Sequence, residues 1–156
     1  FINEVNWSTK RGASGVIPNQ QNIDYLGLTV KMAPNKWLQM AGSLQPFSEQ
    51  DKKIIRGMVE TIKDGGAFAP PYFNIDIPDS WEEGFYHMPA KIIGHEGRHR
   101  LFATLLAENN SEVDVHLFFP GFRRHHFERN PEWLEHLNKS VIDERGNLVS
   151  GPWFSL

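Results

Sequence analysis

The chain has 156 residues, of which 40% are hydrophobic and 22% are charged, and these values suit one globular domain with an apolar core. Its formal net charge of −3 argues against a uniformly basic nucleic-acid-binding surface, and the absence of cysteine excludes disulfides and thiolate chemistry. No apolar run approaches the roughly 20 residues that a membrane-spanning helix needs, so we expect no membrane partner.

The N-terminal part of the chain predicts an irregular arm followed by a strand. Residues 1–24 are rich in Asn, Gln, Ser and Gly and show no sustained periodicity. A strand is expected at 27–32, ending before Pro34, and Asn35 is the expected cap of a short helix. The chain begins with Phe1 rather than Met, which favours a piece of a longer polypeptide whose other domains are partners.

A longer helix and a second strand come next. Ser48 and Asp51 resemble a capping box, and the helical spacing of the apolar residues after them predicts a helix over 48–64. Alternating side chains then predict a strand at 72–77, because such alternation is typical of a half-buried strand. Pro78 is expected to end it.

The middle of the chain predicts a strand, a turn, a helix and another strand. A short apolar strand is expected at 90–93, and Gly94 and Gly97 then permit a tight turn. The helix is expected at 101–109, and an alternating strand at 113–119. This segment brings the residues of greatest chemical interest to one turn.

A last helix closes the predicted fold. Asn130-Pro131 is a good helix start, with Asn as cap and Pro at the first helical position, and residues 145–147 turn the chain toward its tail. The resulting order, β-α-α-β-β-α-β-α, predicts a compact α+β (α/β) domain with a small mixed sheet flanked by helices.

The turn at Gly97-Arg98-His99-Arg100 combines several features that favour a phosphate ligand. Gly97 allows a ligand close to the backbone, and the following helix presents free N–H groups and the positive end of its dipole. Arginine holds phosphate through paired hydrogen bonds, and histidine donates or accepts a proton near neutral pH. A bland alternative remains open, in which these side chains are simply solvated at a helix start.

The same turn resembles a known family. Gly97-Arg98-His99-Arg100, with Leu101 and Ala103 after it and a strand at 113–119, is similar to the core motif of ParB/sulfiredoxin-like domains. In that family a Gly-x-x-Arg turn between a strand and a helix binds nucleotide phosphates. The resemblance covers roughly residues 25–120, and only the turn is specific at residue level.

The resemblance implies domain boundaries and a limited set of activities. It implies an arm at 1–24, a ParB/sulfiredoxin-like core at 25–120, and a C-terminal helix and tail at 121–156 packing on the core. The family includes DNA-partitioning clamps, nucleases, small-molecule kinases and sulfinic-acid reductases, and similar turns occur in phage and plasmid proteins. Sulfiredoxins carry their catalytic Cys where this chain has Arg98, which excludes that one activity.

We therefore expect binding of nucleotide or DNA phosphates. If the protein is an enzyme, we expect a nuclease or a phosphotransferase that uses Mg²⁺ and a nucleoside triphosphate, in the cytoplasm, or in the host cytoplasm if a phage encodes it. Phosphate contacts are assigned to Gly97, Arg98, His99 and Arg100, with His99, Glu96 and Arg100 as catalytic candidates. The sequence leaves open which nucleotide binds and whether a reaction follows.

Two further groups of residues are secondary candidates. Glu96 and Asp76 are the acids nominated for magnesium, since Mg²⁺ prefers oxygen ligands. Arg123 and Arg124 could contact a nucleic-acid backbone, if the strand before them brings them to the same edge of the sheet as the turn. Their bland alternative is a solvated basic loop.

Two other functions remain as alternatives. His95-Glu96-Gly97-Arg98-His99 matches H-E-x-x-H, the motif of zinc hydrolases, which requires both histidines on one face of a helix. Gly97 lies inside that would-be helix and disfavours it by about 1 kcal/mol relative to Ala. The second alternative is a non-catalytic interaction module of a larger phage or plasmid protein.

Overall fold

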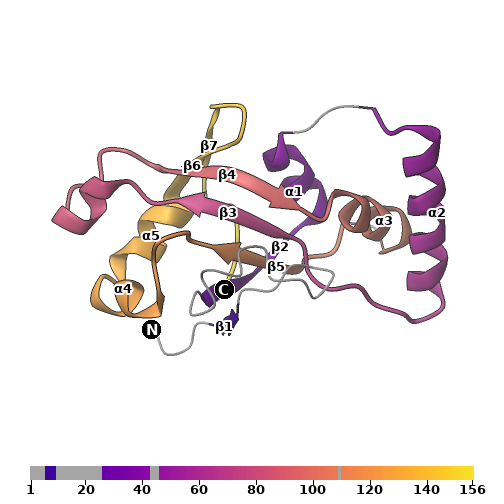
Figure 1. Cartoon of the computed structure of the whole chain (residues 1–156), viewed down its shortest axis with the longest axis horizontal. Helices are drawn as coiled ribbons and strands as arrows, with labels where there is room; N and C mark the ends of the chain where they lie inside the picture. Colours follow the sequence, from indigo (N-terminus) through magenta and orange to yellow (C-terminus); the bar gives the residue numbers. More distant parts are fainter. Residues whose placement is uncertain (1–5, 10–25, 43–45, 109) are drawn as a thin grey trace.

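The computed structural model describes residues 6–9, 26–42, 46–108 and 110–156 (Figure 1). These residues form an α+β fold, as the order of elements predicted. Five α-helices are described: α1 (Pro34–Ala41), α2 (Glu49–Lys63), α3 (Arg98–Glu108), α4 (Arg124–Arg129) and α5 (Glu132–Lys139). A 3₁₀ helix, η3, covers Asp79–Glu83.

The described strands form one mixed sheet in the order β1-β2-β5-β3-β4-β6-β7. Their bounds are β1 (Asn6–Thr9), β2 (Leu26–Met32), β3 (Tyr72–Asp76), β4 (Ala90–Glu96), β5 (Val113–Phe118), β6 (Ser140–Ile142) and β7 (Leu148–Ser150). At the centre of the sheet, β3 runs parallel to β5 and antiparallel to β4. The start of β3 and the end of β4 therefore meet at the same edge of the sheet.

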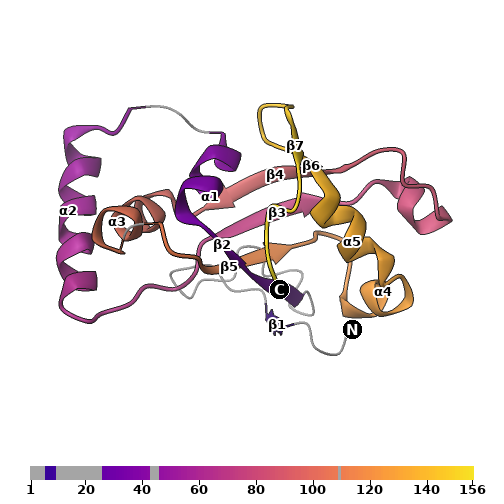
Figure 2. The ribbon, with the colours of Figure 1, turned by 180° about the vertical axis from the view of Figure 1, so that it is seen from behind.

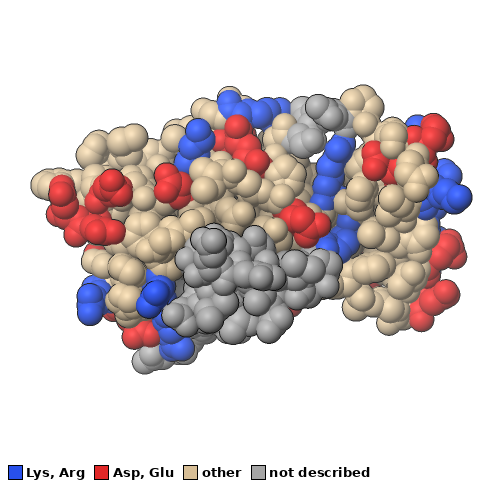
Figure 3. Space-filling view, viewed as in Figure 1, with Lys and Arg blue, Asp and Glu red and all other residues tan. Residues whose placement is uncertain are grey.

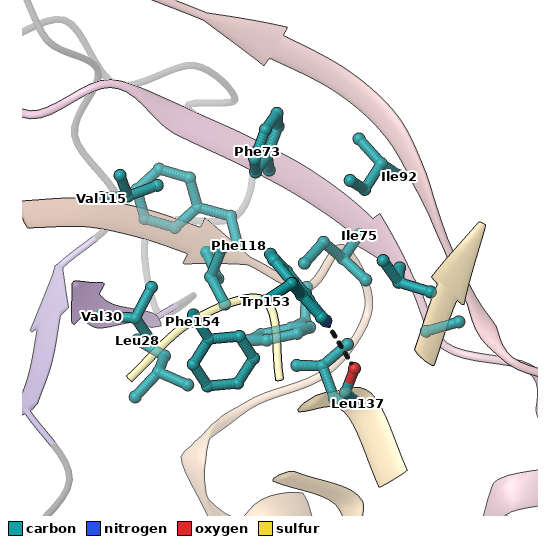
Figure 4. Packing of buried hydrophobic residues seen from close by; sticks show 14 of the residues in the cluster. Leu28, Val30, Phe73, Ile75, Ile92, Val115, Phe118, Leu137, Trp153 and Phe154 are labelled. Carbon is teal, nitrogen blue, oxygen red and sulfur yellow. Dashed lines mark hydrogen bonds between the residues drawn. The ribbon is translucent and has the colours of Figure 1, made fainter. Parts of the chain in front are cut away.

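The core lies against one face of this sheet. Figure 2 shows α1, α5 and the C-terminal segment in front of the strands. Three large side chains from these elements, Trp37, Trp133 and Trp153, are almost fully buried in the core. The rings of Trp37 and Trp153 pack against Phe73 of β3. Trp153 also donates a hydrogen bond from its Nε1 to the Leu137 carbonyl at 2.7 Å (Figure 4), so its one polar atom is satisfied inside the core.

Of three predicted helix caps, one is confirmed and two are wrong. The Ser48 side chain accepts a hydrogen bond from the Asp51 N–H, and the Asp51 carboxylate accepts one from the Ser48 N–H, which confirms the capping box of α2. Asn35, however, does not cap α1. Ala33 holds the cap position and Pro34 opens the helix, because proline at the first helical position loses no intrahelical bond. Asn130 does not cap α5: Pro131 holds the cap position, and the Asn130 side chain donates to the His126 carbonyl at the end of α4 instead.

The structure adds elements that the sequence did not predict. Asn6–Thr9 forms a strand inside the arm that was expected to be irregular, where it pairs with β2; the rest of that arm lies outside the described residues. The tail forms a hairpin, β6–β7, around the predicted turn at 145–147. Residues 124–129 form α4, where a basic loop was the alternative expected. The added strands depend on partners distant in sequence, β2 for β1 and β4 for β6, which local patterns do not report.

Strand β4 is longer than expected. Pairing with β3 continues to the end of β4, where Glu96 lies opposite Tyr72. Gly94 and His95 thus belong to the strand, and Gly97 alone forms the turn before α3 begins at Arg98. No helix in the described part of the chain is both long and apolar enough to cross a membrane.

Candidate phosphate-binding turn

The turn between β4 and α3 requires glycine. Gly97 has φ +123°, a conformation that residues with a side chain rarely adopt. A Cβ placed there would lie 2.4 Å from the Pro71 Cβ and 2.7 Å from Arg100 Nη2. The absence of a side chain therefore lets Pro71 and the Arg100 guanidinium approach the backbone of the turn.

Helix α3 begins directly after this glycine. The Leu101 N–H donates to the Gly97 carbonyl at 3.0 Å, which is the i→i−4 bond of a helix that starts at the turn. The N–H groups of a helix's first turn have no partners within the helix, and its dipole places positive charge there. Arg98, His99 and Arg100 supply the side chains of this first turn.

Arg100 turns back toward the strand. Its residue is only 8% exposed, and Nη2 donates to Glu96 Oε2 at 2.5 Å. Its Nε is buried and has no hydrogen-bond partner in the structure. Arg100 is therefore held under the turn by Glu96, and it keeps one donor unused in a poorly solvated position, where an unpaired polar group is costly.

His99 points to the start of α2 instead. Its Nε2 lies 2.9 Å from Asp51 Oδ1, and both side chains are about one-third exposed, at 37% and 31%. The Ser48 N–H and hydroxyl, then His99, hold the pKa of Asp51 below its usual value. The carboxylate that caps α2 therefore also orients the histidine of α3, so Asp51 is a site residue that the sequence showed only as a helix cap.

Arg98 lies over an aromatic ring. Its guanidinium carbon is 4.0 Å from the centroid of Phe47, within the range of a cation–π contact. The Phe47 ring also contacts Phe102 and lies 5.9 Å from the His99 ring. Phe47 thus forms a platform under the first turn of α3, and no local pattern in the sequence marked it.

Tyr72 completes the strand side of the turn. It is the cross-strand neighbour of Glu96 on one side and of His116 on the other. Burial raises the pKa of the Tyr72 phenol, the Glu96 carboxylate raises it further, and Arg100 opposes this. Burial lowers the pKa of His116, with Asp114 opposing. At neutral pH this strand row therefore presents an uncharged phenol and an uncharged imidazole beside the Glu96–Arg100 pair.

The two histidines of the H-E-x-x-H match do not share a helix. His95 lies in β4, where its Nδ1 bonds to Glu144 of the β6–β7 turn and its ring meets the edge of Trp37. His99 lies in α3 and bonds to Asp51. Within the described ranges, no group of three or more His, Asp or Glu side chains is placed to hold a metal. The helix that this zinc mechanism needs is not formed.

The acids nominated for magnesium lie apart. Glu96 is beside Tyr72 at the start of β3, whereas Asp76 is the last residue of β3 and lies opposite Lys91. Four residues of strand separate the two places by roughly 13 Å at about 3.3 Å per residue. The two carboxylates therefore do not form one site.

Arg123 and Arg124 also lie away from the turn. Because β5 runs parallel to β3, its end points away from Gly97, and Figure 1 shows α3 and α4 at opposite ends of the sheet. The prediction that these arginines lie at the same edge of the sheet as the turn was wrong. Arg124 pairs with Glu128 at 2.6 Å one helical turn further on, as surface arginines commonly do.

On the face that Figure 3 shows, charged side chains of both signs lie in small groups. Figure 3 shows basic side chains beside acidic ones in the region where α3 lies, between the sheet and α2.

No family model matches the chain, and no curated protein or solved structure is significantly similar to it. The geometry of the turn is therefore the basis for assigning a function.

Proposed function

We propose that this protein is a cytoplasmic phosphate-binding domain of the ParB/sulfiredoxin-like type, which binds nucleotide or nucleic-acid phosphates at the Gly97–Arg100 turn. The observation that supports it is the junction of β4 and α3, where Gly97 at φ +123° leads directly into a helix of 11 residues. Backbone N–H groups at such a helix start bind oxyanions. Arg98 and His99 lie in the same first turn and add charge and hydrogen-bond donors.

The side chains at this turn have different roles in the proposed site. Arg98, positioned by Phe47, is the direct phosphate ligand. Arg100 lies beneath the backbone and neutralises charge from below while it bonds to Glu96. When Asp51 accepts a hydrogen from His99 Nε2, the imidazole Nδ1 is left as an acceptor, which suits a general base toward water or a hydroxyl group.

This arrangement suits phosphodiester hydrolysis or phosphoryl transfer if the bound phosphate also reacts. A nucleoside triphosphate would arrive with Mg²⁺ bound to its phosphate oxygens. In proteins that ion is usually held by one or two carboxylates in addition. Glu96 would offer that ion its Oε1, since its Oε2 is engaged by Arg100. His99 then moves a proton and Arg98 holds the phosphate.

The test compares two single arginines. Binding of ATP, CTP and a 20-nucleotide single strand, each with Mg²⁺, is measured by calorimetry for wild type, Arg98→Ala and Arg129→Ala. Arg129 is an exposed arginine of α4, at the opposite end of the sheet, so its loss changes net charge equally. We expect Arg98→Ala to weaken binding roughly 10- to 100-fold, because a hydrogen bond to a charged group contributes about 1.5–3 kcal/mol.

Equal affinities of Arg98→Ala and Arg129→Ala would contradict the assignment. If wild type binds none of the three ligands, the protein is better described as a non-catalytic interaction module. Turnover of a bound ligand, measured as released phosphate or cleaved strand, separates binding from catalysis. His99→Gln should then lower turnover without an equal loss of affinity, since it keeps a polar side chain of similar size.

A further inference from the structure

The connection between β3 and β4 projects from the end of the sheet opposite to the Gly97 turn (Figure 1). It holds two large apolar side chains in water, Phe85 at 61% exposed and Met88 at 53%. Three residues of chain span at most about 11 Å, so one partner surface can contact both side chains. Large apolar side chains that are exposed together are typical of a protein interaction site.

The backbone of this connection is held in place. Trp81 of η3 is 1% exposed, and its Nε1 donates to the Met88 carbonyl at 2.8 Å. Tyr86 stacks on His136 of α5 with ring centroids 3.9 Å apart, and its hydroxyl donates to Glu132 at 2.6 Å. The exposed apolar side chains are therefore presented on a fixed backbone, which reduces the ordering cost of binding.

The same connection is acidic. Asp79, Glu82 and Glu83 are exposed, and residues 77–90 contain no Lys or Arg. Within the described part of the chain, none of the three carboxylates forms an ion pair. Figure 3 shows acidic side chains gathered at this end of the molecule. A partner for this surface needs positive charge beside apolar atoms, which argues against a nucleic acid or an anionic membrane. We call Asp79, Glu82, Glu83, Phe85 and Met88 the acidic tip.

The other end of the molecule carries a surface with the complementary charge. Helix α2 lies there (Figure 1), and Ile55 is its one buried residue. Lys53 and Arg56 are exposed, and neither forms an ion pair with another described residue. Ile54, between them in sequence, is 38% exposed. This part of α2 therefore offers positive charge beside an apolar side chain.

Two of the three acidic residues of α2 are already engaged. Glu49 pairs with Lys52 at 3.3 Å. Asp51 belongs to the capping box and bonds to His99 of α3. The third, Glu60, lies in the second half of the helix. The unpaired charge in the first half of α2 is therefore positive.

Gly57 lies beside these residues on the helix surface, three positions after Ile54 and four after Lys53. In a helix interior, glycine is less favourable than every residue except proline. A Cβ at Gly57 would meet no atom within 4 Å, and its φ is not positive, so nothing in the monomer requires glycine there. The missing side chain leaves a shallow recess on an exposed helix, where a ring from another molecule can approach the backbone. We call Lys53, Ile54, Arg56 and Gly57 the α2 patch.

We propose that the acidic tip of one molecule binds the α2 patch of a second copy of this chain. The Phe85 ring lies over Gly57 and against Ile54. The carboxylates of η3 pair with Lys53 and Arg56. Because the two surfaces lie at opposite ends of the molecule, the contact is head-to-tail, and every pair keeps one free tip and one free patch. Association therefore adds further copies instead of closing as a two-fold dimer.

The test begins with the self-association of wild type. The contact is small, so we expect the dissociation constant of a transient interface, about 0.1 mM. Sedimentation velocity of the full chain from about 10 μM to about 1 mM covers this range. The average mass should rise with concentration and continue past the dimer. It should fall again at high salt, because salt screens exposed charges.

Two variants separate the two surfaces. Phe85→Ser alters the tip and Lys53→Glu alters the patch, and each should weaken self-association at least about 10-fold. An equimolar mixture of the two should associate again and stop at a 1:1 complex, because each variant keeps the surface that the other has lost. Leu148→Ser and Lys139→Glu make matched changes at exposed residues outside both surfaces and should associate as wild type does.

A third variant separates loss of the contact from loss of the fold. Gly57→Gln fills the recess with a better helix former, so it should raise the melting temperature and weaken association at least about 10-fold. Arg98→Ala removes the proposed phosphate ligand and should associate as wild type does. Failure of the phosphate site is therefore distinguishable from failure of this contact.

Several results would overturn the proposal. One is a wild type that stays monomeric at the highest concentration, and another is association that ends at a dimer, which indicates a two-fold contact. A mixture of Phe85→Ser and Lys53→Glu that remains monomeric would also exclude the head-to-tail arrangement. So would a folded Gly57→Gln protein that associates as wild type does.

Discussion

Two helix starts in this protein have similar local sequences but lie in different surroundings. Both α3 and α4 follow a strand and a glycine with positive φ, Gly97 at +123° and Gly121 at +83°, and both open with a run of arginine and histidine. The start of α3 contacts three separate elements through Glu96, Asp51 and Phe47. At the start of α4, Arg124 pairs with Glu128 inside the helix, and the His126 ring packs against Phe122 just before the helix and Trp133 of α5 just after it.

This difference shows what makes a basic turn into a candidate site. A Cβ at Gly97 would collide with Pro71 and Arg100, while a Cβ at Gly121 would meet open space. The backbone of the first turn is thus closely packed and its side chains are held in place, which reduces the ordering cost of binding a ligand. The Arg124–Glu128 pair at the second helix start is more than 40% exposed on both sides, and such surface pairs contribute little energy.

The largest effect is expected from the two glycines. Gly97→Ala should lower the free energy of unfolding by about 3 kcal/mol, because it combines backbone strain of roughly 1–2 kcal/mol with crowding against Pro71. Gly121→Ala meets only the strain and should cost about 1 kcal/mol. Urea unfolding followed by circular dichroism measures both, and equal losses at the two positions would remove the structural distinction between the turns.

The next effect is expected from the arginine of each turn. Arg100→Ala should cost about 2 kcal/mol, since it removes a buried side chain and leaves Glu96, half-exposed at 50%, without its partner. Arg124→Ala removes one half of a pair that is more than 40% exposed on both sides and should cost at most about 0.5 kcal/mol. Thermal unfolding compares the two variants, and a larger loss for Arg124→Ala would contradict the different burial of the two arginines.

The smallest effect is a dependence on pH at Asp51, which belongs to the capping box of α2 and bonds to His99 of α3. The pKa of Asp51 is lowered in the folded protein, chiefly by the Ser48 backbone N–H, so this group stabilises the fold above the unfolded-state pKa of about 3.9. That contribution is lost as the pH falls through the folded-state value. Between about pH 5 and about pH 2, the free energy of unfolding should therefore fall less for Asp51→Asn than for wild type. Parallel pH profiles of the two proteins in urea would speak against a carboxylate role.

Local patterns predicted those parts of the fold that depend on short stretches of chain. The capping box at Ser48 and Asp51, the central strands and the helix after Gly97 all follow from residue spacing over a few positions. The strand at Asn6–Thr9 and the β6–β7 hairpin did not, because three or four residues hold too little periodicity and gain their stability from a neighbouring strand.

The same division applies to the candidate site. Gly97, Arg98, His99 and Arg100 are adjacent in the chain, so their glycine, charge and helix start could be recognised together. Phe47, Asp51 and Tyr72 lie 25 or more residues away, and only the packing of α2 and β3 against α3 brings them to the turn.

The starts of α3 and α4 both carry a run of arginine and histidine, but only the start of α3 is closely packed. Composition marked both as anion sites, and that much follows from the charge of arginine and the free N–H groups of a helix start. Which of them is embedded depends on the direction of β5 beside β3, which sends α4 to the opposite end of the sheet. Strand direction is set by hydrogen bonds between segments distant in sequence, so only the folded chain distinguishes the packed turn at Gly97 from the exposed one at Gly121.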